Sequence, residues 1–86
     1  MKKKCKIVEV EWLDITDRNE WQTSDEIDKE HCCIVRTYGI LYSYNSKELK
    51  VIPTVAEDID KPFGDVVVIP KGCIKKIRKL YYKEEK

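Results

Sequence analysis

At 86 residues the chain is long enough for one hydrophobic core, and too short for a second domain or a deep enclosed active-site cavity. Its composition, 42% hydrophobic and 38% charged, is that of a folded globular protein and argues against a disordered one. No apolar run approaches the roughly eighteen residues that a membrane-spanning helix needs. Because no signal-peptide core follows Met1, we expect a cytoplasmic protein that does not contact a membrane.

Residues 5–13 alternate apolar and acidic side chains, which predicts a half-buried strand with one face in the core. The apolar positions are Val8, Val10 and Trp12, and the acidic positions are Glu9 and Glu11. The first strand of the protein therefore carries an acidic outer face.

Residues 14–30 lack this periodicity and form a long polar, acidic loop. Thr23 or Ser24 is placed to cap a short helix over residues 25–28, so one or two helical turns are expected there. Trp21 stands alone in this polar stretch. It is either an anchor that pins the loop to the body of the protein, which we favour, or a stacking platform for a base.

Residues 32–44 are rich in β-branched and aromatic side chains and predict a long second strand. Gly39 in its middle indicates a bend or bulge of the kind that curls a sheet. Tyr38 and Tyr42 alternate along this strand, and we expect them in or at the edge of the core.

Residues 45–48 predict a turn into a third strand over residues 49–56, giving a hairpin. Pro53 cannot donate a ladder hydrogen bond, so it places this strand at an edge or breaks it. Residues 57–65 form an acidic loop.

Residues 66–69 are a continuous apolar run, typical of a strand buried on both faces, and Pro70 with the following Lys-Gly turn ends it. Residues 73–82 are ambiguous, because their apolar positions are three apart. That spacing fits a short helix or a tight turn followed by a strand, and we favour the turn and strand. The positions are Ile74, Ile77 and Leu80.

Five short strands, a long bent second strand and a tight turn before the last strand resemble the plan of small SH3-like or Sm-like barrels. The expected fold is thus mainly β: one five-stranded barrel over residues 1–86, with the acidic loop and its short helix between strands one and two. A domain this small has a thin stability margin, so a homo-oligomer is expected.

The chain also resembles small phage and prophage proteins of unassigned function. The resemblance covers most of the sequence and rests on Val-Glu-Trp-Leu-Asp at 10–14, Trp21, Thr-Tyr-Gly at 37–39 and the segment 68–77. It implies an origin in a mobile element, hence a location in the host cytoplasm, and a compact β fold. It supplies neither catalytic residues nor a ligand.

No arrangement of residues predicts an enzyme, a metal site or a cofactor. His31 is the single histidine, its neighbours Cys32 and Cys33 are too close along a strand for nucleophile and base, and nothing points to a pairing with Cys73. The four cysteines, which include Cys5, are interpreted as thiols because no export sequence is recognisable. The three glycines are isolated, so no phosphate-binding glycine loop exists.

Charge is segregated along the chain. Residues 9–30 hold nine acidic and two basic residues, a sum of −7, and residues 71–79 hold five basic residues and no acidic one. If the first and last strands are neighbours, the basic segment and the N-terminal lysines merge into a patch that attracts phosphates. The alternative is that these lysines keep exposed strands soluble and unpaired.

Three functions remain open, all of them binding. The first is sequestering a phosphate-bearing host nucleotide that signals anti-phage defence. The second is inhibition of a host protein by the acidic loop, and the third, less favoured, is nucleic-acid binding. The candidate ligand-binding residues are Trp21, Arg36, Tyr38, Lys71, Lys75 and Lys76.

Overall fold

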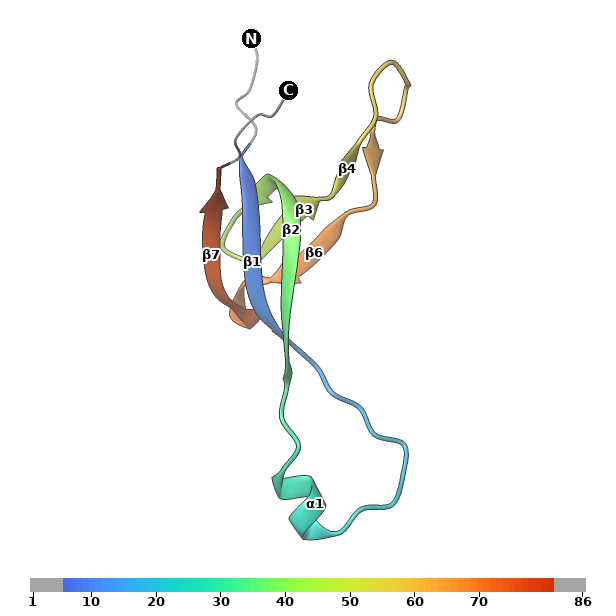
Figure 1. Ribbon diagram of the computed structural model, residues 1–86, viewed down its shortest axis with the longest axis vertical. Helices are drawn as coiled ribbons and strands as arrows, with labels where there is room; N and C mark the ends of the chain where they lie inside the picture. Colours follow the sequence, from blue (N-terminus) through green and yellow to red (C-terminus); the bar gives the residue numbers. More distant parts are fainter. Residues whose placement is uncertain (1–5, 82–86) are drawn as a thin grey trace.

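The computed structural model describes residues 6–81, which form a mainly β structure with one short helix (Figure 1). In chain order the elements are β1 (Ile7–Asp14), α1 (Ser24–Asp28), β2 (Cys33–Tyr44), β3 (Glu48–Ile52), β4 (Thr54–Val55), β5 (Phe63–Gly64), β6 (Val67–Pro70), the 3-10 turn η1 (Lys71–Cys73) and β7 (Ile74–Leu80). Five strands form an antiparallel sheet in the order β6-β3-β2-β1-β7, and β4 and β5 form a separate hairpin. No helix in this part of the chain is long and apolar enough to cross a membrane.

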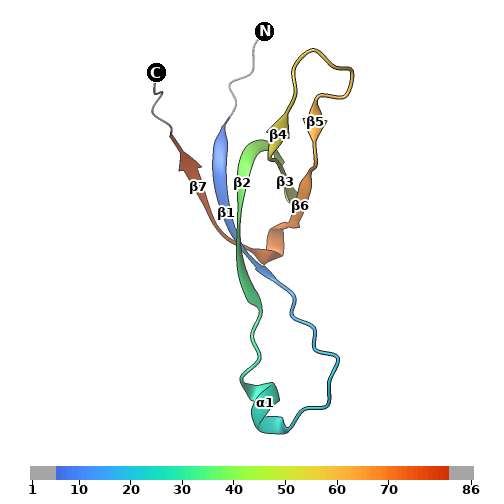
Figure 2. The same ribbon diagram turned by 45° about the vertical axis from the view of Figure 1, so that its right-hand side comes forward.

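The five-stranded sheet is bent but open, so the predicted closure into an SH3-like or Sm-like barrel is wrong (Figure 2). Closure would require a hydrogen-bonded ladder between β6 and β7. Instead β6 pairs with β3 and β7 pairs with β1, and η1 carries the chain from one edge of the sheet to the other. The condition set for a merged basic patch, that the first and last strands are neighbours, is met, because β1 pairs with β7.

The core lies on one face of the bent sheet, where β1, β3 and β6 meet. The predicted alternation in β1 is confirmed, because Val8 and Val10 are buried while Glu9 and Glu11 face outward. Trp12 packs at the margin of this core and donates from its indole Nε1 to Oγ1 of Thr37, 3.0 Å away. The fully buried side chains are Val8, Val10, Leu49, Val51 and Ile69.

Gly39 allows β2 to approach β3 closely. A Cβ atom at this position would lie 2.6 Å from the carbonyl oxygen of Ile52 and 2.8 Å from Cγ1 of Val51. The pairing of the two strands then shifts register between Leu41 and Ser43. The predicted bend in the second strand is thus present, with the glycine at the close contact and the irregularity two residues later.

Two predictions about the later strands are confirmed and one is wrong. Pro53 interrupts the third strand, so β3 ends and the chain leaves the main sheet for the hairpin. Residues 73–82 are a turn followed by a strand, as far as the described residues reach. The run at 66–69 is not buried on both faces: Val68 is 47% exposed, because no second layer covers the outer face of this edge strand.

The expected burial of two tyrosines is also wrong. Tyr38 is 52% exposed and Tyr42 is 59% exposed. Tyr38 lies opposite Glu9 in the pairing of β1 with β2, which places it on the acidic outer face of the sheet.

Candidate interaction surfaces

The segment between β1 and β2 forms an arm that projects away from the sheet (Figure 1). We call residues 15–32 the arm. Its helix α1 begins at a capping box, in which the Thr23 hydroxyl accepts a hydrogen bond from the Glu26 amide at 3.2 Å and the Glu26 carboxylate accepts one from the Thr23 amide. The predicted short helix and its cap are confirmed.

Side-chain contacts join the two legs of the arm. The Glu30 carboxylate accepts hydrogen bonds from Arg18 Nε at 3.3 Å and from Gln22 Nε2 at 3.2 Å. Nearer the sheet, the Thr16 hydroxyl donates to the carbonyl of His31 at 2.8 Å. These contacts, with the capping box, join the two legs of the arm, which buries no apolar residue.

Trp21 is fully exposed at the far part of the arm, so its expected role as an anchor on the body of the protein is wrong. The arm extends away from the sheet and thereby keeps the indole ring out of reach of the core. The ring borders a shallow hollow that Arg18, Asn19, Glu20, Gln22 and Ile27 complete. Ile15 and Ile27 are exposed on the same arm.

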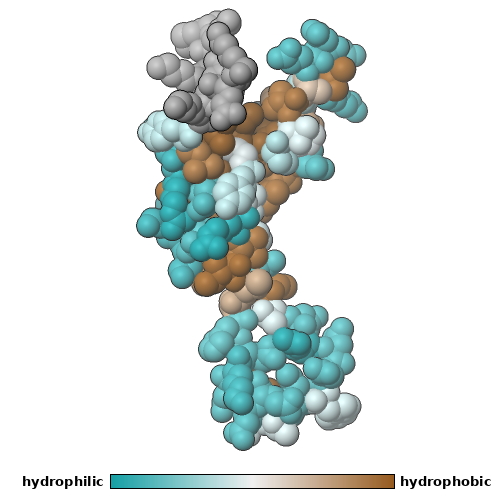
Figure 3. Space-filling model, viewed as in Figure 1, coloured by the Kyte–Doolittle hydropathy of each residue, from teal (hydrophilic) through white to brown (hydrophobic). Residues whose placement is uncertain are grey.

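The arm carries a net negative charge. Its residues, 15–32, include six acidic and two basic ones, a sum of −4. In the space-filling view the lower part of the molecule is hydrophilic almost throughout (Figure 3). The arm therefore presents one exposed aromatic ring on a segment of net negative charge.

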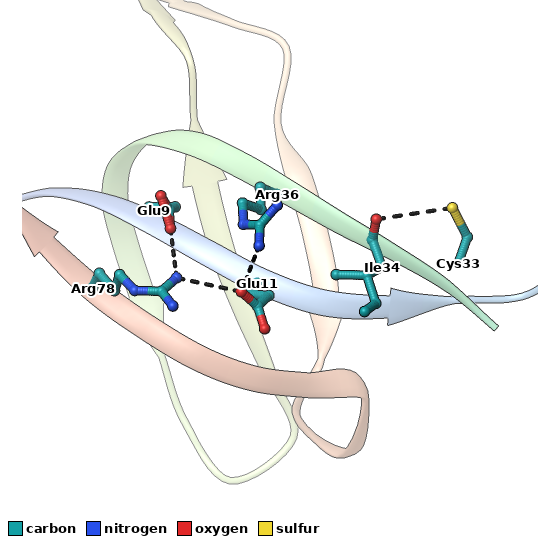
Figure 4. A network of polar contacts seen from close by, with 6 residues as sticks. All are labelled: Glu9, Glu11, Cys33, Ile34, Arg36 and Arg78. Atoms are coloured by element: carbon teal, nitrogen blue, oxygen red, sulfur yellow. Dashed lines mark hydrogen bonds and ion pairs between the residues drawn. The ribbon is translucent and has the colours of Figure 1, made fainter.

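A second polar surface lies on the outer face of β1, β2 and β7 and is centred on Glu11 (Figure 4). The Glu11 carboxylate is 3.3 Å from Arg36 Nη2 and 3.4 Å from Arg78 Nη1. Arg78 also donates to Glu9 at 2.6 Å, and Lys76 lies opposite Glu11 in the ladder. Two glutamates on β1 thus neutralise arginines from both neighbouring strands.

The electrostatics of this network follow from the contacts. Partial burial acts to raise the pKa of Glu11, but the hydrogen bond from Arg78 and the charges of Arg36, Arg78 and Lys75 outweigh it and hold that pKa below its ordinary value. The hydrogen bond to Glu9 raises the pKa of Arg78 further above its already high ordinary value. The outer face therefore keeps its charges fixed at neutral pH.

The structure brings together some of the predicted ligand-binding residues. Arg36, Lys75 and Lys76 gather around Glu11, and Tyr38 is adjacent, opposite Glu9. Lys71 lies elsewhere, in η1, with Nζ 5.7 Å from the centre of the Tyr44 ring, and Trp21 is on the arm. The lysines at positions 2–4 fall outside the described residues.

Sequence reasoning missed the partners of the basic strand. Glu9 and Glu11 were assigned to an acidic solvent face, yet they pair with Arg78 and Arg36 across the sheet. The sequence did contain a signal for these ion pairs: a Glu-x-Glu pattern on one strand and a basic pattern on a strand expected beside it. Side chains that face each other on neighbouring strands interact. Of the basic residues in 71–79, only Arg78 has an ion pair in the described part of the chain, and Lys71, Lys75, Lys76 and Lys79 have none.

A third surface is an apolar groove beside β6. It has a volume of about 520 Å³, and the Tyr42 and Phe63 rings meet edge to face across it, with centroids 5.9 Å apart. We call it the β6 groove; its lining residues are Tyr42, Lys50, Ile52, Phe63, Asp65, Val66 and Val68.

No family model, curated protein or solved structure matches the chain. Among residues 6–81 no group of His, Cys, Asp and Glu side chains is arranged to hold a metal ion, and Cys32, Cys33 and Cys73 are free thiols. The surfaces themselves therefore carry the functional argument.

Proposed function

We propose that the protein is a non-enzymatic binding protein that docks its arm onto a basic surface of another protein. The observation that carries the proposal is the fully exposed Trp21 on an arm held by a capping box and by the Glu30 contacts. This indole ring makes no contribution to the core. The exposure of this ring supports a role in contacting a partner, because tryptophan is strongly enriched at the energetic centres of protein interfaces.

The charge of the arm supports a basic partner. The arm has a net negative charge, and complementary charge accelerates association and disfavours acidic surfaces. The contacts between the two legs also reduce the conformational entropy that the arm would lose on binding. With the resemblance to phage proteins, the expected partner is a host protein whose binding surface is basic.

Sequestering of a nucleotide has less support. Arg36 and Arg78 already pair with Glu11 and Glu9, and a phosphate would have to compete with these carboxylates. Trp21 and Lys71 belong to other parts of the molecule. A phosphate-bearing ligand would have to rely on Lys75 and Lys76 beside Tyr38.

The test compares two variants of the full chain that each remove one exposed aromatic ring. Trp21→Ala removes the ring of the arm, and Tyr81→Ala removes a ring that is 86% exposed after β7. A bacterial protein that the unaltered chain captures is purified and titrated against all three chains by calorimetry. We expect Tyr81→Ala to bind as the unaltered chain does and Trp21→Ala to bind about 30-fold more weakly, the effect of losing about 2 kcal/mol at an interface centre.

Two further measurements distinguish binding of a protein from binding of a nucleotide: the salt dependence of binding and the melting temperature with added nucleotide. Binding through the arm weakens as salt is raised, because the attraction is between opposite charges. If Trp21→Ala binds the captured protein as tightly as the unaltered chain does, the proposal is contradicted. A melting temperature that rises on addition of nucleotides, and no longer rises in Lys75→Glu and Lys76→Glu, would favour the nucleotide instead.

A further inference from the structure

β6 is an edge strand: among residues 6–81, no strand pairs with the side of its backbone that faces away from β3. The Lys71 amide donates to the carbonyl of Lys47 at 2.9 Å, toward β3. Since backbone groups alternate along a strand, those of Ile69 and Val67 also point toward β3, and those of Val68 and Pro70 point away from the sheet. Pro70 lacks an amide hydrogen. Because its nitrogen lies on the side of β6 away from β3, no hydrogen bond of the ladder between β3 and β6 is lost.

The two edges of the sheet differ in protection against pairing. β7 carries Lys75, Lys76, Arg78 and Lys79, and charged side chains are the usual device that keeps an edge from adding another strand. β6 has the sequence Val-Val-Ile-Pro and carries no charge. The charges of β7 thus disfavour the addition of another strand, and β6 has no such protection.

Apolar side chains beside the open edge are available for burial. Val66 and Val68 are about half exposed and line the β6 groove with Tyr42 and Phe63. The hydrophobic surface continues along this side of the molecule to the base of the β4–β5 hairpin (Figure 3). A partner that adds to β6 would cover these side chains as well as the backbone.

We infer that the partner is a second copy of this chain, paired antiparallel through β6 about a two-fold axis at Val68. In this register each Val68 amide donates to the carbonyl of the partner's Val68, and each Val66 amide lies opposite the carbonyl of the partner's Pro70. The missing donor of Pro70 is then harmless, since only its carbonyl is used. The two apolar grooves become neighbours across the axis.

Charge complementarity selects this arrangement. Asp65 precedes the strand and Lys71 follows it. Antiparallel pairing centred on Val68 brings Asp65 of each copy to the end where the partner's Lys71 lies, so two opposite-charge pairs flank the apolar centre. The arm and the β4–β5 hairpin lie at opposite ends of the molecule (Figure 1). A dimer formed through β6 therefore leaves the arm free to bind another protein.

The first test is the mass of the full chain by sedimentation equilibrium over a concentration series. A dimer is expected. Val68→Lys places two like charges opposite each other at the axis and should raise the dissociation constant of the dimer by about tenfold or more. The matched control is Ile34→Lys, the same kind of change at a position that is 52% exposed on β2, and it should leave the dimer intact.

Hydrogen exchange of the unaltered chain tests the register without a mutation. The Val68 amide, which has no acceptor among residues 6–81, should exchange slowly at concentrations where the dimer forms and fast on dilution. A monomer at every concentration, a ring or filament larger than a dimer, or a Val68 amide that exchanges fast in the dimer overturns the inference.

A charge cycle tests the flanking pairs. Lys71→Glu sets two acids against each other and should weaken the dimer, and adding Asp65→Asn should restore part of the affinity. Asparagine suits this position because residue 65 has a φ of +61°, which asparagine and aspartate tolerate. Equal dissociation constants for all variants contradict the proposed register.

Discussion

The close approach of β2 to β3 makes Gly39→Ala the sharpest test of the fold. The added Cβ would lie 2.6 Å from the Ile52 carbonyl oxygen and 2.9 Å from the Ile52 carbonyl carbon. Both atoms belong to the backbone of a strand that is paired on both sides. They cannot move aside as a flexible side chain would, so the strands must separate locally.

Overpacking of this kind costs about 3 kcal/mol, the upper part of its usual range, because the obstructing atoms are backbone. For a domain of this size each kcal/mol lowers the melting temperature by roughly 4–8 °C. We therefore expect Gly39→Ala to melt roughly 10–25 °C below the unaltered chain. The measurement is thermal unfolding followed by circular dichroism, with urea unfolding as a second estimate of the free energy.

Gly72→Ala is the matched control, since a Cβ at that glycine meets no atom within 4 Å. Its free energy of unfolding should stay within about 0.5 kcal/mol of the unaltered value. If the two alanine variants melt within a few degrees of each other, the close approach of β2 and β3 at Gly39 is wrong.

Three other predictions concern the ion pairs, the arm and the core. The lowered pKa of Glu11 means that its ionised form stabilises the fold above the ordinary carboxyl pKa, and this contribution is lost as the pH falls through the lowered value. Glu11→Gln should therefore lower the melting temperature near pH 7 but not near pH 2, and an equal loss at both would contradict the ion-pair account. Thr23→Ala removes a cap worth about 1 kcal/mol from a helix that buries no residue, so hydrogen exchange in α1 should accelerate while the global melting temperature stays constant. Leu49→Ala removes a fully buried side chain and should cost about 2–5 kcal/mol by urea unfolding; a loss below about 1 kcal/mol would show that Leu49 is not in the core.

Local patterns of the sequence predicted the elements that depend on neighbouring residues. Val8 and Val10 alternate with acids because one face of β1 is buried, and Thr23 precedes acids that begin a helix. Pro53 ended β3 because it has no amide to donate. Each of these outcomes follows from chemistry within a few positions of the chain.

Burial and closure depended on packing between distant segments, and there the sequence misled. Tyr38 shares its face with Arg36, two residues earlier, so its exposure could have been predicted from period-two alternation. The exposure of Trp21 could not, because it depends on the direction in which the arm leaves the sheet. The open edge beside Val68 likewise depends on which strands pair, and an apolar run alone does not distinguish a central strand from an unguarded edge.

The most direct test of the central claim is crosslinking in bacterial cells from a photoreactive phenylalanine analogue that replaces Trp21, with the same analogue in place of Tyr81 as the reference. Both positions are exposed, so both report contacts without disturbing the core. If the arm is the binding surface, position 21 crosslinks to one protein with a basic surface and position 81 does not. No crosslink from position 21, or the same products from both positions, would contradict it.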